Sequence, residues 1–234
     1  MTMEQILTAL KEVSSLHLGE GTASARPACW LRVVLRALLG LVCGLLGGLI
    51  LWLIPGDRAV GTLLATLAVV GLRACLAHPS DKNAFLDLSA DFAPVDLETK
   101  APNQFFRQAI FNILLLVRPL CLYFILLHHN FLWLCAAAAL AQAIRIDEET
   151  APENRRPVAL HWLAATVITL AVGAFASKVI DGQQSMFILS VIAVILCWLF
   201  PYMLDRLCAH RTPAAMLYLG ETAALVLGLL GQAL

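Results

Sequence analysis

Charged residues are scarce in this chain. Only 14% of its 234 residues are charged, the sixteen basic and sixteen acidic residues cancel, and 60% of residues are apolar. A net charge of zero offers no electrostatic attraction for nucleic acid, so we expect no nucleic-acid partner. A soluble domain of this length could not bury so much apolar surface. With a mean hydropathy of +0.82, the composition predicts an integral membrane protein.

Neither the cysteine spacing nor the common catalytic motifs indicate a soluble enzyme. The seven cysteines show no CxxC spacing, and most lie in or beside apolar runs. An odd number scattered in this way argues against a disulfide framework and against a zinc site. The chain also lacks GxxxxGK[ST], HExxH, GxSxG and the dinucleotide-binding glycine pattern. Its chemistry must therefore be sought among the few charged residues.

Long apolar runs are the main feature that is present. Crossing ~30 Å of hydrocarbon takes ~20 helical residues. The runs predict an all-α transmembrane bundle of about seven spans in a single domain, 1–234: 33–54, 59–76, 109–127, 130–145, 158–176, 185–204 and 213–234. The apolar part of the fourth span, from Phe131 to Ile144, would extend only ~21 Å. A re-entrant hairpin that turns at residues 128–130 is therefore an open alternative.

The N-terminal segment, residues 1–30, does not have the pattern of a cleaved signal peptide. Apolar side chains recur at helical spacing between positions 6 and 16, among Glu4, Lys11 and Glu12. This pattern predicts an amphipathic helix that lies in the headgroup region of the membrane.

The distribution of lysine and arginine predicts the orientation. If the N-terminus is cytoplasmic, thirteen of the sixteen basic residues lie in cytoplasmic segments, whereas the outside turns hold only Arg58 and Lys178. This bias predicts a cytoplasmic N-terminus and an external C-terminus. The expected location is a bacterial inner membrane. The acidic loops 77–108 and 145–156 would then both be cytoplasmic.

Glycines in the first span also follow a pattern. Gly40, Gly44 and Gly48 recur at i, i+4. Such a stripe predicts a face where a second helix packs closely.

Two charged residues lie deep within predicted spans, away from their ends, namely Arg118 and Glu221. Each is eight or nine residues from the cytoplasmic start of its span, which places both ~12–14 Å deep and predicts that they pair. Two interpretations stay open: the pair only fixes the packing of two helices, or Glu221 helps to line a polar cavity open to the cytoplasm.

The segment FLDLSADFAPVDLETK, residues 85–100, concentrates carboxylates. Asp87 and Asp91 are spaced i, i+4, which would place both on one helix face, and Asp96 follows. These acids could simply be solvated in a cytoplasmic loop. Alternatively they could hold Mg²⁺ or Mn²⁺, which bind through one or two carboxylates together with substrate phosphates.

The order of these features resembles the cobalamin synthase family, the adenosylcobinamide-GDP ribazoletransferases. Four segments are similar to family motifs: ILTALKEVSSLHL (6–18), GLVCGLLGGLILWLI (40–54), LDLSAD (86–91) and YLGETAAL (218–225). The chain departs from the family at Phe85, Leu88 and Pro94, where the family has histidine, glycine and a third aspartate, and at Glu221, where it has aspartate.

The resemblance implies a Mg²⁺- or Mn²⁺-dependent membrane transferase that joins adenosylcobinamide-GDP to α-ribazole or its phosphate and releases GMP. Corrinoid and nucleotide-type molecules would be its substrates. It implies catalytic roles for Asp87, Asp91 and Glu221, metal ligands at these three residues and Asp96, and phosphate contacts from Arg107 or Arg118. A non-catalytic membrane scaffold and a small transporter are the alternatives. The lipid bilayer is an expected partner, and a homo-oligomer stays open.

Overall fold

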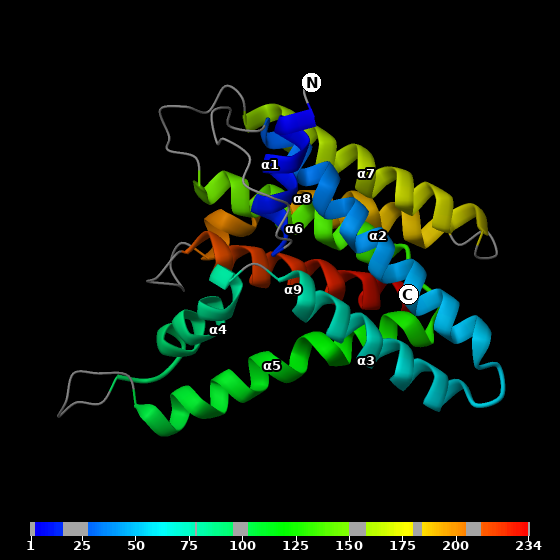
Figure 1. Cartoon of the computed structure of the whole chain (residues 1–234), viewed down its shortest axis with the longest axis horizontal. Coiled ribbons are helices and arrows are strands. Elements are labelled where there is room, and N and C mark those ends of the chain that lie inside the picture. Colours follow the sequence, from blue (N-terminus) through cyan, green and yellow to red (C-terminus); the bar gives the residue numbers. More distant parts are fainter. Residues whose placement is uncertain are drawn as a thin grey trace.

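The computed structural model describes residues 3–15, 28–77, 79–95, 103–149, 158–179, 184–204 and 212–233. Within these ranges the chain is all-α, as the sequence predicts (Figure 1). Its helices are α1 (Met3–Val13), α2 (Cys29–Leu53), α3 (Arg58–Leu76), α4 (Pro79–Asp91), α5 (Gln104–Leu127), α6 (Trp133–Glu149), α7 (Val158–Val179), α8 (Gln184–Leu204) and α9 (Pro213–Ala233).

Helix α6 forms the centre of the bundle, in contact with α2, α7, α8 and α9. Every residue from Trp133 to Ile144 is buried, and half of these residues are alanines. Small side chains let neighbouring helices approach closely on all sides of α6. The Trp133 indole N–H donates a hydrogen bond of 2.8 Å to the buried carbonyl of Ala224, which joins α6 to α9.

The predicted glycine face of α2 packs against α6. A Cβ atom at Gly40 would lie 2.5 Å from the Leu134 carbonyl oxygen, and one at Gly44 would clash with the Phe131 carbonyl oxygen. A Cβ atom at Gly48 would lie 3.5 Å from the Phe131 ring, which is an ordinary contact distance. The predicted close packing is confirmed for Gly40 and Gly44.

Six described helices are long and apolar enough to cross a membrane, namely α2, α3, α5, α7, α8 and α9. Helix α6 is not among them, because it has 17 residues and ends in charged residues from Arg145 to Glu149. In Figure 1, α6 runs back between α5 and α7, which both run the opposite way. The membrane character is supported, whereas the count of seven spans is not confirmed.

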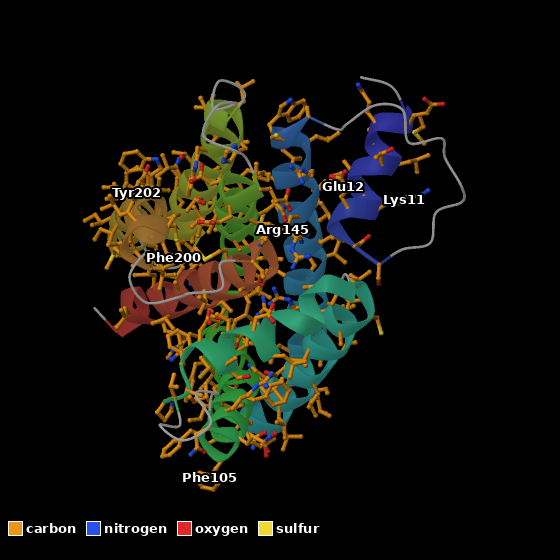
Figure 2. The ribbon with its side chains drawn as sticks, turned by 90° about the vertical axis from the view of Figure 1, so that its left-hand side faces the viewer. Lys11, Glu12, Phe105, Arg145, Phe200 and Tyr202 are labelled. Carbon is orange, nitrogen blue, oxygen red and sulfur yellow. The ribbon has the colours of Figure 1, made fainter. Side chains whose placement is uncertain are left out.

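Helix α1 is amphipathic, with Ala9 and Val13 buried, and packs against α2 (Figure 2). Glu12 forms a 3.4 Å ion pair with Arg32 of α2. Beyond the helix, the Ser15 backbone N–H donates to the Leu76 carbonyl at 3.1 Å, at the end of α3. These contacts attach α1 to the bundle, while its expected place in the headgroup region stays a prediction.

The segment expected to be a long acidic loop contains a helix. Within 77–108, α4 takes up Pro79–Asp91 and packs against α5 and α9. Helix α5 begins at Gln104, earlier than position 109, because the Asn103 side chain accepts hydrogen bonds from the backbone N–H groups of Phe105 and Phe106. In the other acidic segment, residues 145–149 form the last turns of α6, and 150–156 lie outside the described residues.

Candidate anion-binding site

Glu221 of α9 is the most deeply buried carboxylate of the site, with 1% of its side chain exposed. One of its oxygens binds the guanidinium of Arg118 from α5, and the other binds the guanidinium of Arg73 from α3. A buried carboxylate without cationic partners would be very unfavourable. The two arginines therefore stabilise the charged form of Glu221 and connect three helices.

The predicted pairing of Arg118 with Glu221 is confirmed, although α5 begins earlier than expected. Because α5 begins at Gln104, Arg118 is fourteen residues along its helix, or ~21 Å, whereas Glu221 is eight residues from Pro213, or ~12 Å. The side chains still meet because the first turns of α5 extend beyond the end of the bundle, towards α4 (Figure 1).

Tyr218, one turn before Glu221, orients Arg118. Its ring centroid lies 4.7 Å from the guanidinium carbon of Arg118, a distance at which the ring face attracts a cation. The tyrosine hydroxyl donates a hydrogen bond to the Leu114 carbonyl of α5. Tyr218 thus fixes both the side chain of Arg118 and the helix that carries it.

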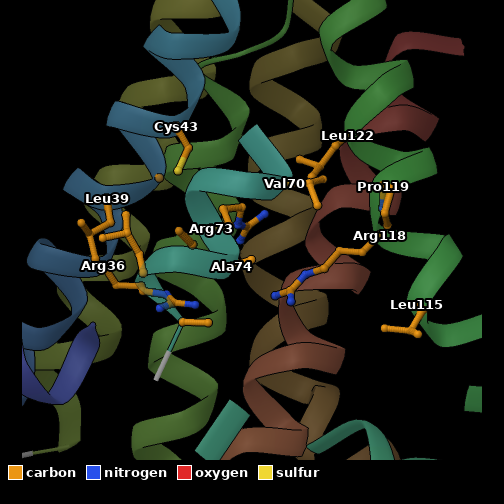
Figure 3. Close-up of a pocket in the computed structure, with 14 residues that line it drawn as sticks. Arg36, Leu39, Cys43, Val70, Arg73, Ala74, Leu115, Arg118, Pro119 and Leu122 are labelled. Atoms are coloured by element: carbon orange, nitrogen blue, oxygen red, sulfur yellow. The ribbon is translucent and has the colours of Figure 1, made fainter. Parts of the chain in front are cut away.

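A cavity of about 310 Å³ lies beside this network, among α2, α3, α5 and Ala138 of α6. Three arginines from three different helices line it: Arg36, Arg73 and Arg118. Figure 3 shows Arg36 and Arg118 extending from opposite sides towards the middle of the cavity, with Arg73 between them. We call this cavity and its three arginines the arginine pocket.

Arg36 also connects the pocket to the N-terminal helix. Its guanidinium donates a 3.0 Å hydrogen bond to the Val13 carbonyl, at the C-terminal end of α1. Carbonyls in the last turn of a helix have no partner within the helix, and a cation there is favourable. The Ser15 hydroxyl donates to the Cys75 carbonyl at 2.6 Å. The end of α1 therefore lies close to the pocket residues Arg36 and Leu76.

The predicted aspartates lie on α4. Asp87 and Asp91 fall on one helix face, as the i, i+4 spacing predicts, and both are half-buried. They adjoin the buried positions Ala84 and Leu88. Asp96 lies outside the described residues. Helix α4 contacts α5 and α9, the two helices that bear Arg118 and Glu221.

The described residues do not test the predicted metal site, because Asp96 lies outside them. They contain no group of three or more histidine, cysteine, aspartate or glutamate residues that could hold a metal ion. Both oxygens of Glu221 bind arginines in this structure. The metal site of Asp87, Asp91, Asp96 and Glu221 stays a prediction.

Arg107, the other predicted phosphate ligand, lies in the first turn of α5 and is half-buried. It is not among the residues that line the arginine pocket. Of the two predicted phosphate ligands, only Arg118 lies in the pocket.

Sequence reasoning did not identify Arg36 and Arg73 as site residues. The orientation analysis assigns both to the cytoplasmic basic residues, because each lies near the predicted cytoplasmic end of its span. A signal was present, since both belong to apolar helices rather than to loops. An arginine inside such a helix indicates that a polar cavity or a buried partner lies beside it.

Comparison of the chain with models of protein families, with curated proteins and with solved structures finds no match.

Proposed function

We propose that this membrane protein binds a small anion in the arginine pocket, and that its substrates bear phosphate groups. The observation that supports this proposal is that three arginines from three helices line a single cavity of about 310 Å³. Cavities of this size are at the small end of the range for small-molecule sites.

Arginine is the side chain best suited to this role. Its planar guanidinium presents several N–H donors in a fork that matches phosphate and carboxylate oxygens, and it stays charged at all physiological pH values. Arginines within membrane-spanning helices are unfavourable in hydrocarbon and commonly line substrate paths. An ion-pair network that only joined α3, α5 and α9 would account for Arg73 and Arg118. Such a network does not include Arg36 of α2, which lines the same cavity and uses one N–H group on the Val13 carbonyl.

Binding of inorganic phosphate to the purified protein in lipid nanodiscs tests the proposal. We expect saturable binding that weakens about tenfold or more in Arg36→Gln, because a hydrogen bond to a charged group contributes about 1.5–3 kcal/mol. Arg36→Lys keeps the charge and should lose less affinity. The matched control is Arg58→Gln at the opposite end of α3, where the arginine binds the Leu127 carbonyl at 3.0 Å.

Two results would contradict anion binding in this pocket. One is the absence of saturable phosphate binding in the wild-type protein. The other is equal affinity in the wild type, Arg36→Gln and Arg58→Gln, with all three proteins folded as judged by their unfolding midpoints.

A membrane transferase resembling cobalamin synthase is the second candidate. It is favoured by the position of the LDLSAD segment on α4, which packs against the helices of Arg118 and Glu221. In this proposal the arginine pocket would hold the phosphates of a nucleotide-type substrate. The residues described in the structure do not form a metal-ligand set, so we derive no step through a metal ion.

Complementation of a strain that lacks cobalamin synthase tests this candidate. The wild-type gene should restore growth that depends on cobalamin, and Asp87→Ala should not restore it. Growth restored equally by Asp87→Ala would exclude the predicted role of this aspartate. Failure of the wild-type gene, with the protein present in the membrane, would exclude the transferase and leave phosphate binding to be judged by its own assay.

A further inference from the structure

We propose that the ligand of the arginine pocket is an anionic amphiphile. Its phosphate or carboxylate head lies at the three arginines, and its apolar chain extends towards Cys43, Val70 and Leu122. This inference rests on the proposed anion binding and adds the class of ligand.

The three arginines cross the pocket, with Leu76 and Leu115 on one side of them and a longer apolar part on the other side. We call this longer part the apolar end. Helices α2 and α5 run in one direction and α3 runs in the other (Figure 1). Cys43 follows Arg36 on α2, Leu122 follows Arg118 on α5, and Val70 precedes Arg73 on α3. These three apolar residues therefore lie on the same side of the arginines, as Figure 3 shows.

The apolar end is built for a hydrocarbon chain rather than for a second polar group. Cys43 and Leu122 are buried and Val70 is half-buried. Leu39 and Pro119 continue the apolar wall between the arginines and this end. Placing a methylene group against such a surface is favourable, whereas a polar group without a hydrogen-bond partner there would be unfavourable.

The dimensions favour a short chain. Arg36 and Cys43 are seven residues apart on α2, which corresponds to about 10 Å along the helix axis. A volume of about 310 Å³ accommodates a head group and a short chain. It is too small for a whole two-chain phospholipid.

The position of the pocket agrees with a ligand that arrives from the bilayer. Large apolar side chains are exposed on the outer faces of the two helices that flank the cavity, among them Val42 of α2 and Leu116 and Leu120 of α5. These faces are suited to lipid contact, and an amphiphile concentrates in the lipid beside them.

A series of n-alkyl phosphates, from ethyl to decyl, tests the inference by competition with inorganic phosphate. The protein is held in nanodiscs, and affinities refer to the free aqueous concentration of each ester. We expect affinity to rise about fourfold for each added methylene and then to level off once the apolar end is full. Val70→Phe fills that end and should abolish the rise in affinity with chain length.

The matched control is Leu67→Phe, which adds similar bulk on the exposed outer face of the same helix. It should retain the dependence on chain length. Cys43→Leu fills the same end from α2 and serves as the second variant if Val70→Phe does not fold.

Three results would overturn the amphiphile. The first is equal affinity for inorganic phosphate and octyl phosphate, which would indicate a wholly polar ligand in a pocket that still binds anions. The second is a dependence on chain length that persists in both Val70→Phe and Cys43→Leu, which would place the alkyl chain outside the pocket. The third is no binding of inorganic phosphate or of any ester, in which case the proposed anion binding fails as well.

Discussion

Arg73 and Arg118 bind the two oxygens of one buried carboxylate, that of Glu221. The arginines come from α3 and α5, and the carboxylate from α9. The two arginines therefore share the carboxylate of Glu221. This sharing determines which single substitution should be most damaging.

We predict that Glu221→Ala destabilises the protein more than Arg118→Ala or Arg73→Ala. Without Glu221, two partly buried guanidinium groups face each other, and breaking a buried pair in this way costs about 3–5 kcal/mol. Removal of one arginine leaves Glu221 with the other. Unfolding equilibria in mixed micelles measure the three losses, and equal losses would contradict the shared arrangement.

Glu221→Gln should strengthen phosphate binding in the arginine pocket. The carboxylate of Glu221 competes with a bound anion for Arg73 and Arg118, and glutamine keeps its shape without its charge. We expect roughly a tenfold gain, the effect of one charge-assisted hydrogen bond. Titration with inorganic phosphate measures it. Weaker binding in Glu221→Gln, with an unchanged gel-filtration profile, would show that the carboxylate orients the arginines rather than competing for them.

Gly40→Ala should destabilise the bundle by about 1–3 kcal/mol. The new Cβ would lie 2.5 Å from the backbone carbonyl of Leu134, so α2 and α6 would have to separate. Gly71→Ala on α3 is the control, because nothing lies within 4 Å of a Cβ at that position. It should be neutral or stabilising by up to about 1 kcal/mol, the difference in helix propensity. Thermal unfolding in detergent compares the two, and equal midpoints would be inconsistent with close contact between α2 and α6.

The termini should lie on opposite sides of the membrane, with the N-terminus in the cytoplasm. The bias of thirteen basic residues to two predicts this orientation. Helices α5, α6 and α7 alternate in direction, which agrees with α6 passing back through the bundle (Figure 1). Reporter fusions after Leu234 and within residues 80–100 should report opposite compartments. Reporters on the same side would exclude an odd number of crossings.

The class of protein and part of its internal packing were predictable from the amino-acid sequence. Apolar runs long enough for the bilayer predicted the helices, because exposing so much apolar surface to water is unfavourable. The glycine stripe predicted close contact, because only a residue without Cβ allows a neighbouring backbone within that distance. Arg118 and Glu221 were predicted to pair, because isolated charges in an apolar bundle need partners.

Which helices surround the charged residues depends on how the helices pack in three dimensions, and no local pattern predicts it. Helical spacing shows which side chains share a face, but not which helix that face meets. The meeting of Arg73 with Glu221, and of Arg36 with the end of α1, depends on how α2, α3, α5 and α9 pack. The central position of α6 likewise follows from contacts among its alanines and the glycines of α2 and α9. Packing in three dimensions, rather than any local pattern, therefore brings three arginines to one cavity.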